Sequence, residues 1–349
     1  MTDGWTGRIL DAPRVAPNEA SLKPALDALG GEVVKLRARD GLRLGGRWLP
    51  AEAAPAPGAT DGGSDTGGKA PLDPWRPDPY EAILLLHGWT GSIVPDLVEL
   101  GPTLRRTAGV LGLDFRGHGT SDEAPSTFGL HEIEDVAGAL DWLGERGIRR
   151  VVLVGSSMGG TVAIAAIVVL GDGTLRQADL DPAAPAASVE APRPRIVGAV
   201  AESVPTDLRI PIANRIRLPL GGPIRRAVAG RLFSMASRRL GGDIRATEAG
   251  RIVRLVDPVP LLLIHGGADR TVPPKDGRRL AALAGPATEH WEVPGADHRG
   301  SRPADPAQWD LRVSRFVRQA FLGAREVVPI IHTSGEPTPE FVHAGPEGD

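Results

Sequence analysis

Short apolar runs alternate with amphipathic stretches along most of the chain. The apolar runs are rich in Val, Ile and Leu, as in buried strands, and the stretches between them place apolar residues at helical spacing. Strands that alternate with helices in this way predict an α/β protein with a mostly parallel, doubly wound sheet. The predicted strands are 82–86, 109–115, 151–154, 196–204, 259–265 and 289–293, and the predicted helices are 95–106, 131–145, 161–167, 223–240, 274–283 and 306–322.

The two ends of the chain and two internal segments depart from this rhythm. Residues 32–49 alternate apolar and polar around Asp40-Gly41, a dipeptide that favours a hairpin of two antiparallel strands, and a short helix is expected near 22–29. The Pro-rich segments 51–79 and 171–195 are expected to be flexible insertions. We therefore divide the chain into an N-terminal extension (1–30), one α/β domain (31–323) that contains a helical cap (205–257), and a polar, disordered tail (324–349).

The cap region is strongly basic. Residues 207–254 contain 11 arginines against Asp207, Asp243 and Glu248. Its predicted helix, 223–240, is expected to pack an apolar side on the body and to leave its arginines in water. A further hypothesis makes this region a lid whose basic surface attracts anionic substrates or allows peripheral contact with lipid headgroups. The apolar side is formed by Ile224, Val228, Leu232, Met235 and Ala236.

Composition narrows the class of protein. A formal net charge of −3 argues against a nucleic-acid partner, and the absence of cysteine excludes disulfides and thiolate chemistry. No basic region followed by an apolar run opens the sequence, and the longest apolar run, 162–170, is too short to cross a bilayer. We expect a cytoplasmic protein without stable membrane insertion; the sequence does not predict its oligomeric state.

One motif joins the predicted strand 151–154 to the helix that follows it. Gly155-x-Ser157-x-Gly159 has the form of a nucleophile elbow, in which a serine on a tight strand-to-helix turn exposes its hydroxyl. The following helix N-terminus then offers N–H groups to a developing oxyanion. Because the glycine-rich composition gives roughly 0.2 chance matches per chain, a plain loop of small residues is the competing interpretation.

Two further residues follow strand ends that a parallel sheet would bring near this serine. Asp269 and His298 come after the predicted strands 259–265 and 289–293, which gives the chain order Ser, acid, His. A serine hydroxyl needs an imidazole to accept its proton and a carboxylate to orient that imidazole. Alternatives remain for both partners: Glu202 or Asp207 for the acid, and His118, His265 or His290 for the base.

These residues resemble the α/β-hydrolase superfamily over roughly residues 32–323, in particular its serine esterase and peptidase branch with a small helical cap after the sixth strand. The resemblance implies that Ser157 is the nucleophile, His298 the general base and Asp269 the acid that orients it. It also implies an oxyanion hole formed by the backbone N–H groups of Trp89 and Met158. The matching segments are His87-Gly88-Trp89, 114–119 with His118, 155–159, 266–269 and 295–298; we expect His87, Gly88 and His118 to shape the site.

The resulting prediction is a serine hydrolase that cleaves a carboxylic ester or thioester of a small-molecule acyl substrate through an acyl-enzyme. A peptidase or amidase, an acyltransferase or perhydrolase, or a non-catalytic binding protein on the same fold are the alternatives. No cofactor or metal is expected, since no phosphate-loop lysine follows Gly160 and the acidic cluster 131–135 is interpreted as an exposed helix start.

Overall fold

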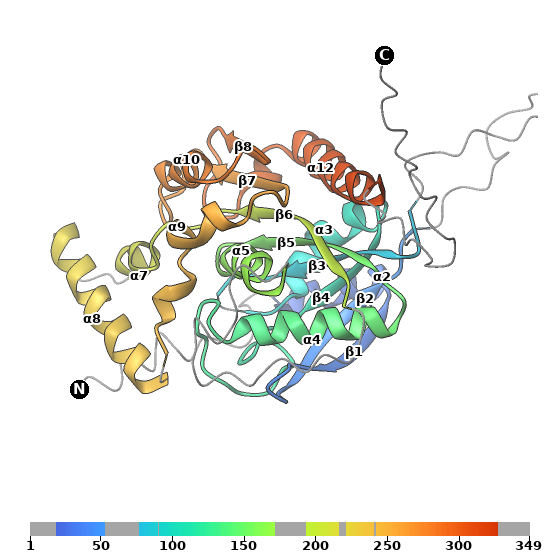
Figure 1. The fold of residues 1–349 in the computed structure, drawn as a ribbon, viewed down its shortest axis with the longest axis horizontal. Helices are drawn as coiled ribbons and strands as arrows, with labels where there is room; N and C mark the ends of the chain where they lie inside the picture. Colours follow the sequence, from blue (N-terminus) through green and yellow to red (C-terminus); the bar gives the residue numbers. More distant parts are fainter. Residues whose placement is uncertain are drawn as a thin grey trace, which may run out of the picture.

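The computed structural model describes residues 19–52, 77–89, 91–171, 193–215, 221–240 and 242–326. Within these ranges eight strands form one sheet in the order β1-β2-β4-β3-β5-β6-β7-β8 (Figure 1). The strands are β1 (Glu32–Arg37), β2 (Arg43–Leu49), β3 (Glu81–Leu86), β4 (Gly109–Leu113), β5 (Arg150–Ser156), β6 (Arg195–Glu202), β7 (Leu261–Gly266) and β8 (Thr288–Val293).

Strand direction divides the sheet into two parts. β1 and β2 form the antiparallel hairpin expected around Asp40-Gly41, with Gly41 at φ +94°, and β2 is also antiparallel to β4. From β4 to β8 every neighbouring pair is parallel. The α/β-hydrolase fold, with an N-terminal hairpin on a mostly parallel sheet, is therefore confirmed.

Helices cover both faces of this sheet (Figure 1). One apolar core lies between the sheet and the helices α4, α5 and α10, and the other lies against α3 and α12. The helices of the body are α2 (Glu19–Leu29), α3 (Val94–Leu104), α4 (Glu132–Glu145), α5 (Met158–Leu170), α10 (Pro274–Leu283), α11 (Ser301–Ala304) and α12 (Pro306–Glu326).

Burial explains why the central strands read as continuous apolar runs. Every residue of β3, β4 and β7 is buried, because helices cover both of their sides. α5, which follows the elbow, is buried over all but its last residue. The loops after β3, β5, β7 and β8 therefore begin from this buried layer and lie at one edge of the sheet, which is where ligands bind in open α/β folds. In the ranges described, no helix is both long and apolar enough to cross a membrane.

The segment between β6 and β7 is helical. It contains α7 (Arg209–Arg215), α8 (Gly222–Leu240), the 3₁₀ turns η1 (Ile244–Thr247) and η2 (Val253–Leu255), and α9 (Ala249–Ile252). We call residues 205–257 the cap. In Figure 1, α8 stands at the outside of the molecule and α7 lies between it and the sheet.

The predicted apolar side of α8 needs one correction. The buried residues are Ala229, Leu232, Phe233 and Ala236, whereas Ile224 is 55% exposed. Ile224 lies five positions before Ala229, which places the two side chains about 140° apart around the helix. The two residues therefore cannot share a face. The buried stripe is thus centred on Phe233, which the sequence reading left out.

Several predicted segments fall outside the described ranges. The insertions expected at 51–79 and 171–195 are described only at their edges, and the expected tail, 324–349, only up to residue 326. The division of the chain into extension, domain and tail remains a prediction.

Candidate active site

The elbow between β5 and α5 holds Ser157 in a left-handed backbone conformation, with φ +54° and ψ −112°. This region is unfavourable for a residue with a Cβ, so the surroundings must enforce it. The Ser157 N–H donates to the Glu202 carbonyl at the end of β6 (2.7 Å), and the Ser157 carbonyl accepts the Thr161 N–H in α5 (3.0 Å). The strained serine is therefore tied to both a strand and a helix.

The glycines of the elbow are required by sterics. A Cβ on Gly155 would lie 2.4 Å from the Gly159 carbonyl oxygen, and a Cβ on Gly159 would lie 2.2 Å from the carbonyl oxygen of Leu86. Both obstacles are backbone atoms that cannot rotate away. The motif thus reflects close backbone approach around Ser157, and the interpretation as an ordinary small-residue loop is not needed.

Ser157, His298 and Asp269 form one hydrogen-bonded chain. His298 Nε2 lies 3.1 Å from Ser157 Oγ, and His298 Nδ1 lies 2.8 Å from Asp269 Oδ2. The other carboxylate oxygen, Oδ1, accepts the N–H groups of Thr271 and Val272, each at 2.8 Å. Because Asp269 accepts at Nδ1, we assign the imidazole proton to Nδ1, which leaves Nε2 free to accept from the serine hydroxyl.

The alternative acids are engaged elsewhere. The Glu202 carboxylate accepts the Ser301 N–H (3.0 Å), and burial raises the pKa of Glu202. Asp207 forms an ion pair with Arg209. Asp269, by contrast, faces His298 directly.

The histidines considered as alternative bases lie elsewhere in the fold and contact other groups. His265 Nε2 lies 2.9 Å from the Val272 carbonyl oxygen, behind Asp269, and His290 lies within the edge strand β8. His118 is fully buried, with its Nδ1 2.8 Å from the Arg116 carbonyl oxygen. His298 Nε2, by contrast, lies 3.1 Å from Ser157 Oγ.

His87 orders the loop that precedes Trp89. Its Nε2 accepts the Phe115 N–H (3.1 Å), so Nδ1 carries the proton and donates to the Gly88 carbonyl oxygen (2.7 Å). Burial, reinforced by the neighbouring His118, lowers the pKa of His87 well below its usual value, so the ring is neutral. His87 and His118 pack edge to face, 5.0 Å between ring centroids, and neither lines the pocket beside the serine.

Trp89 and Met158, the two residues expected to supply oxyanion donors, both line a small apolar pocket with Ser157. Met158 is the first residue of α5, where backbone N–H groups lack partners within the helix. The cavity holds about 20 Å³, room for little more than one water molecule. Its remaining walls are Phe128, Thr161, Pro205, Leu208, Pro211, Ile212 and Thr271.

An aromatic row links this pocket to the cap. The Trp89 and Phe128 rings lie 5.5 Å apart, and Phe128 meets Phe233 of α8 edge to face at 5.9 Å. Phe128 has φ +56°, and its carbonyl oxygen accepts from Thr247 Oγ1 in η1 (3.4 Å). The pocket walls therefore depend on the placement of the cap, a relation that helical periodicity could not reveal.

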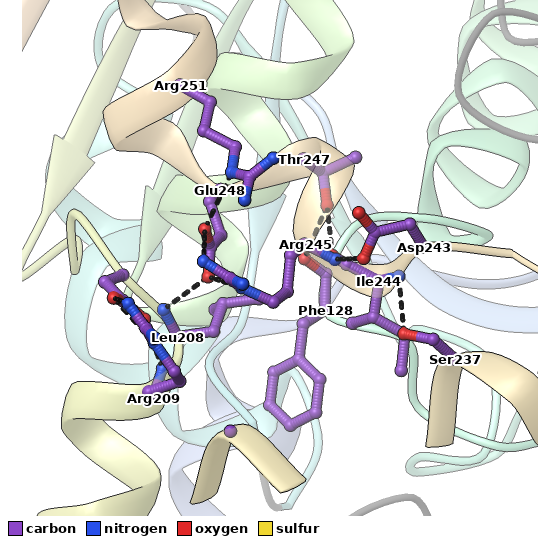
Figure 2. Close-up of polar contacts among 12 residues, drawn as sticks. Phe128, Leu208, Arg209, Ser237, Asp243, Ile244, Arg245, Thr247, Glu248 and Arg251 are labelled. Atoms are coloured by element: carbon purple, nitrogen blue, oxygen red, sulfur yellow. Dashed lines mark hydrogen bonds and ion pairs between the residues drawn. The ribbon is translucent and has the colours of Figure 1, made fainter. Parts of the chain in front are cut away.

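Glu248 anchors the cap from within (Figure 2). Its carboxylate, 3% exposed, accepts from Arg245 (2.9 and 3.1 Å), Arg251 (3.0 Å) and the Leu208 N–H (3.3 Å). These contacts join the start of α7 to η1 and α9. Because Leu208 is also a wall of the pocket beside Ser157, this ion-pair cluster helps to position that wall.

Arg299, which follows His298, was not found by sequence reasoning. Its backbone is left-handed (φ +58°), its N–H donates to Ser203 Oγ (3.1 Å), and its guanidinium pairs with Asp96 of α3 (2.5 Å). A Cβ on Gly88 would lie 3.3 Å from Arg299 Nη1, so the guanidinium also lies against the loop before Trp89. The sequence offered one signal for the role of Arg299, because a cationic residue stands directly after the candidate base His298.

The expectation that residues 131–135 form an exposed helix start is wrong. Glu132 is fully buried and accepts the N–H groups of Thr127 and Gly129, both at 2.7 Å. Asp135 is also buried and pairs with Arg116. The preceding loop folds back over the helix start, so these carboxylates serve as acceptors for backbone and guanidinium groups.

A parallel sheet with a serine elbow, followed along the chain by an acid and a histidine that converge on it, defines a hydrolase of the α/β class. Comparison of sequences agrees, since the alpha/beta hydrolase family matches residues 83–309. The chain belongs to this family.

Relatives at the level of sequence are distant. The uncharacterized protein YfhR of Salmonella typhimurium (strain LT2) is 26% identical over 228 residues, which is 64% of this chain and 66% of that protein, just under two thirds of its length. YfhR of Escherichia coli (strain K12) is 25% identical over 295 residues, 82% of this chain and 81% of that protein.

Solved structures share the fold. The esterase Pf2001 of Pyrococcus furiosus superposes with a TM-score of 0.57 and 21% identity, covering 89% of this chain and 99% of its own. An alpha-beta hydrolase from Vibrio vulnificus gives the same TM-score with 18% identity, over 90% of this chain and 92% of its own. At such identities the likeness concerns architecture alone.

Proposed function

We propose that this protein is a serine hydrolase that cleaves carboxylic esters or thioesters through an acyl-enzyme. The observation that carries the proposal is the continuous hydrogen-bonded chain from Ser157 Oγ through His298 to Asp269. The strained elbow supports it further, because backbone strain at a serine persists only where the surroundings enforce it.

The proposed reaction has two halves. Ser157 Oγ attacks the acyl carbon while His298 Nε2 takes the hydroxyl proton, and Asp269 stabilises the imidazolium that forms. The N–H groups of Trp89 and Met158 receive the negative charge on the acyl oxygen. His298 then protonates the leaving alcohol or thiol as its bond to the acyl carbon breaks. Water, deprotonated by the same nitrogen, releases the carboxylic acid and restores Ser157.

The pocket beside the serine suits the acyl part of the substrate, because aromatic and aliphatic walls surround it. At about 20 Å³ the cavity is too small for an acyl chain of several carbons. Binding such a chain therefore requires displacement of the walls that the cap provides, Leu208, Pro211 and Ile212. We propose that residues 205–257 act as a cap whose position sets acyl-chain length.

The test is hydrolysis of p-nitrophenyl esters from acetate to palmitate by the native protein and by Ser157→Ala. We expect the substitution to lower kcat/KM by about 10⁴-fold or more, because it removes the nucleophile. Ser156→Ala is the matched control: its hydroxyl is buried without a partner among the described residues, so replacement costs little.

Labelling with a fluorophosphonate separates the remaining outcomes. Labelling of the native protein but not of Ser157→Ala, without ester turnover, would retain the reactive serine and reject simple esters as substrates. Absence of both turnover and labelling would overturn the proposal.

A further inference from the structure

A second concave site lies on the other side of α7 from the serine pocket. It is a cleft of about 760 Å³ between α7, α8 and α10, and it opens to solvent. Its charged side chains are Arg209, Arg226, Lys275, Arg279, Asp207 and Asp276. Cations thus outnumber carboxylates in the cleft, although the whole chain is slightly acidic.

The segment between Asp207 and Asp243, which forms one side of this cleft, lacks acidic residues. Between Asp207 and Asp243 there are eight arginines and no Asp or Glu. The carboxylates at the borders of the region are used internally: Asp207 pairs with Arg209, Glu248 holds Arg245 and Arg251 (Figure 2), and Asp243 accepts the Arg245 N–H. Little negative charge is therefore available to neutralise the remaining arginines.

Three cations of the cleft form no ion pair within the described part of the chain, although the charge of Lys275 acts on the neighbouring Asp276 and opposes the effect of burial on the pKa of that carboxyl. Arg226, Lys275 and Arg279 have no ion-pair partner among the residues described, and all three side chains are exposed. Although burial opposes the effect, hydrogen bonds from Arg209 lower the pKa of Asp207, so this pair is charged and cancels itself. Asp276 accepts the Thr206 N–H (3.2 Å), and burial raises its pKa.

The cleft also adjoins the candidate active site. Pro205, Leu208, Pro211 and Ile212 line the serine pocket, whereas Thr206, Asp207, Arg209 and Ile210 line the cleft. One segment, 205–212, therefore separates the two sites, and a helix is only about 10 Å across. Asn214 of α7 further donates to the Thr271 carbonyl oxygen (2.9 Å), two residues from Asp269.

We propose that this cleft binds a phosphate monoester group carried by the alcohol part of the substrate. Two guanidinium groups and an ammonium that form no ion pair within the described ranges complement a dianion better than they complement the single charge of a carboxylate ligand, and arginine suits phosphate oxygens geometrically. α8 begins at the cleft without an acidic residue in its first turn, so its helix dipole adds to the attraction. This inference rests on the proposed function for the acyl half of the substrate.

Binding is tested on the Ser157→Ala protein, so that it does not depend on turnover. Inorganic phosphate is titrated by calorimetry into this protein, into the same protein with R226Q, K275Q and R279Q, and into a control with R231Q, R238Q and R239Q. The control removes the same charge from exposed positions of α8 outside the cleft. We expect phosphate to bind at least about tenfold more weakly to the cleft variant and within about twofold of the parent to the control.

Equal weakening in both variants would overturn the proposal, because it would indicate general attraction to a basic helix. Absence of phosphate binding to the parent would also overturn it. Circular dichroism and the thermal midpoint of each variant establish that the folded state is intact before the titrations are compared.

Turnover then identifies the source of the phosphate. Because the phosphate must reach past a helix about 10 Å across, the probe is the butanoate ester of 10-hydroxydecyl phosphate, compared with the monobutanoate of decane-1,10-diol. The ratio of kcat/KM for the phosphorylated ester to that for the unphosphorylated one is expected to fall about tenfold in the cleft variant on the native Ser157 background. Vesicles of phosphatidic acid and of phosphatidylcholine provide the other arm. If the protein binds the acidic vesicles but not free phosphate, the cleft is rejected as a phosphate site, and the basic residues are assigned to contact with a membrane surface. Phosphate binding without ester turnover would reject the proposed function and leave the anion site standing.

Discussion

The elbow and the cap are held in place by different kinds of interaction. Around Ser157 the chain is fixed by backbone atoms in contact and by strands and a helix that are almost wholly buried. The cap has a short apolar stripe on α8 and a cluster of ion pairs around Glu248. Precision at the nucleophile therefore comes from steric necessity, whereas the cap depends on charge pairing that water can replace.

A pair of glycine substitutions gives the largest expected difference between the two regions. Gly159→Ala places a Cβ 2.2 Å from a backbone oxygen, so we expect loss of at least about 4 kcal/mol of stability, or failure to fold. Gly230→Ala, within α8, meets only Arg209 Cδ at 3.4 Å and should stabilise by about 0.5–1 kcal/mol. Urea unfolding measures both, and similar values for the two variants would refute the comparison.

Removing the charge of Glu248 is expected to loosen the cap while leaving the sheet unchanged. Glu248→Gln keeps an acceptor but leaves Arg245 and Arg251 without a counter-charge, at a cost of about 1–2 kcal/mol, since both guanidiniums are partly exposed. Hydrogen exchange should accelerate in α7 and η1 and stay constant in β3 and β5.

Asp243→Asn is the control for this variant. It removes the same charge from the same region, but asparagine can still accept the Arg245 N–H. We expect its exchange rates to match the native protein. Faster exchange in the control alone would show that helix capping, and not the Glu248 cluster, holds the cap.

The smallest expected effect concerns pH and a carboxyl group in the body. Burial raises the pKa of Glu202 above 4.5, so the folded protein binds more protons than the unfolded chain above that pH. This group therefore stabilises the fold at acid pH, and its contribution is lost as pH rises through the raised pKa. Glu202→Gln should flatten the fall of the thermal midpoint as pH rises above 4.5, and an unchanged slope would contradict the assignment.

The parallel sheet and the order of the candidate site residues could be predicted from sequence, because buried strands and the elbow carry strong local signals. Val151–Val154 had no polar position to confuse the pattern, and the glycines on either side of Ser157 mark close backbone approach. The fold class therefore followed from periodicity and turn residues.

The errors arose where long-range contacts decide. Glu132 and Asp135 look like a solvated helix start until a loop from 127 to 129 covers them. Ile224 looks like a core residue until the helix is placed against the body. The Asp96–Arg299 pair joins residues that are 203 positions apart and share no periodicity.

The shared wall at 205–212 has an evolutionary consequence. Because four residues of this segment line the serine pocket and the other four line the basic cleft, a substitution that enlarges one site moves the backbone of the other. If the cleft and the pocket bind two parts of one substrate, as proposed, preferences for those two parts then cannot drift independently. Lineages that diverge in this segment should change both preferences together, while the elbow, confined by backbone atoms, stays the same.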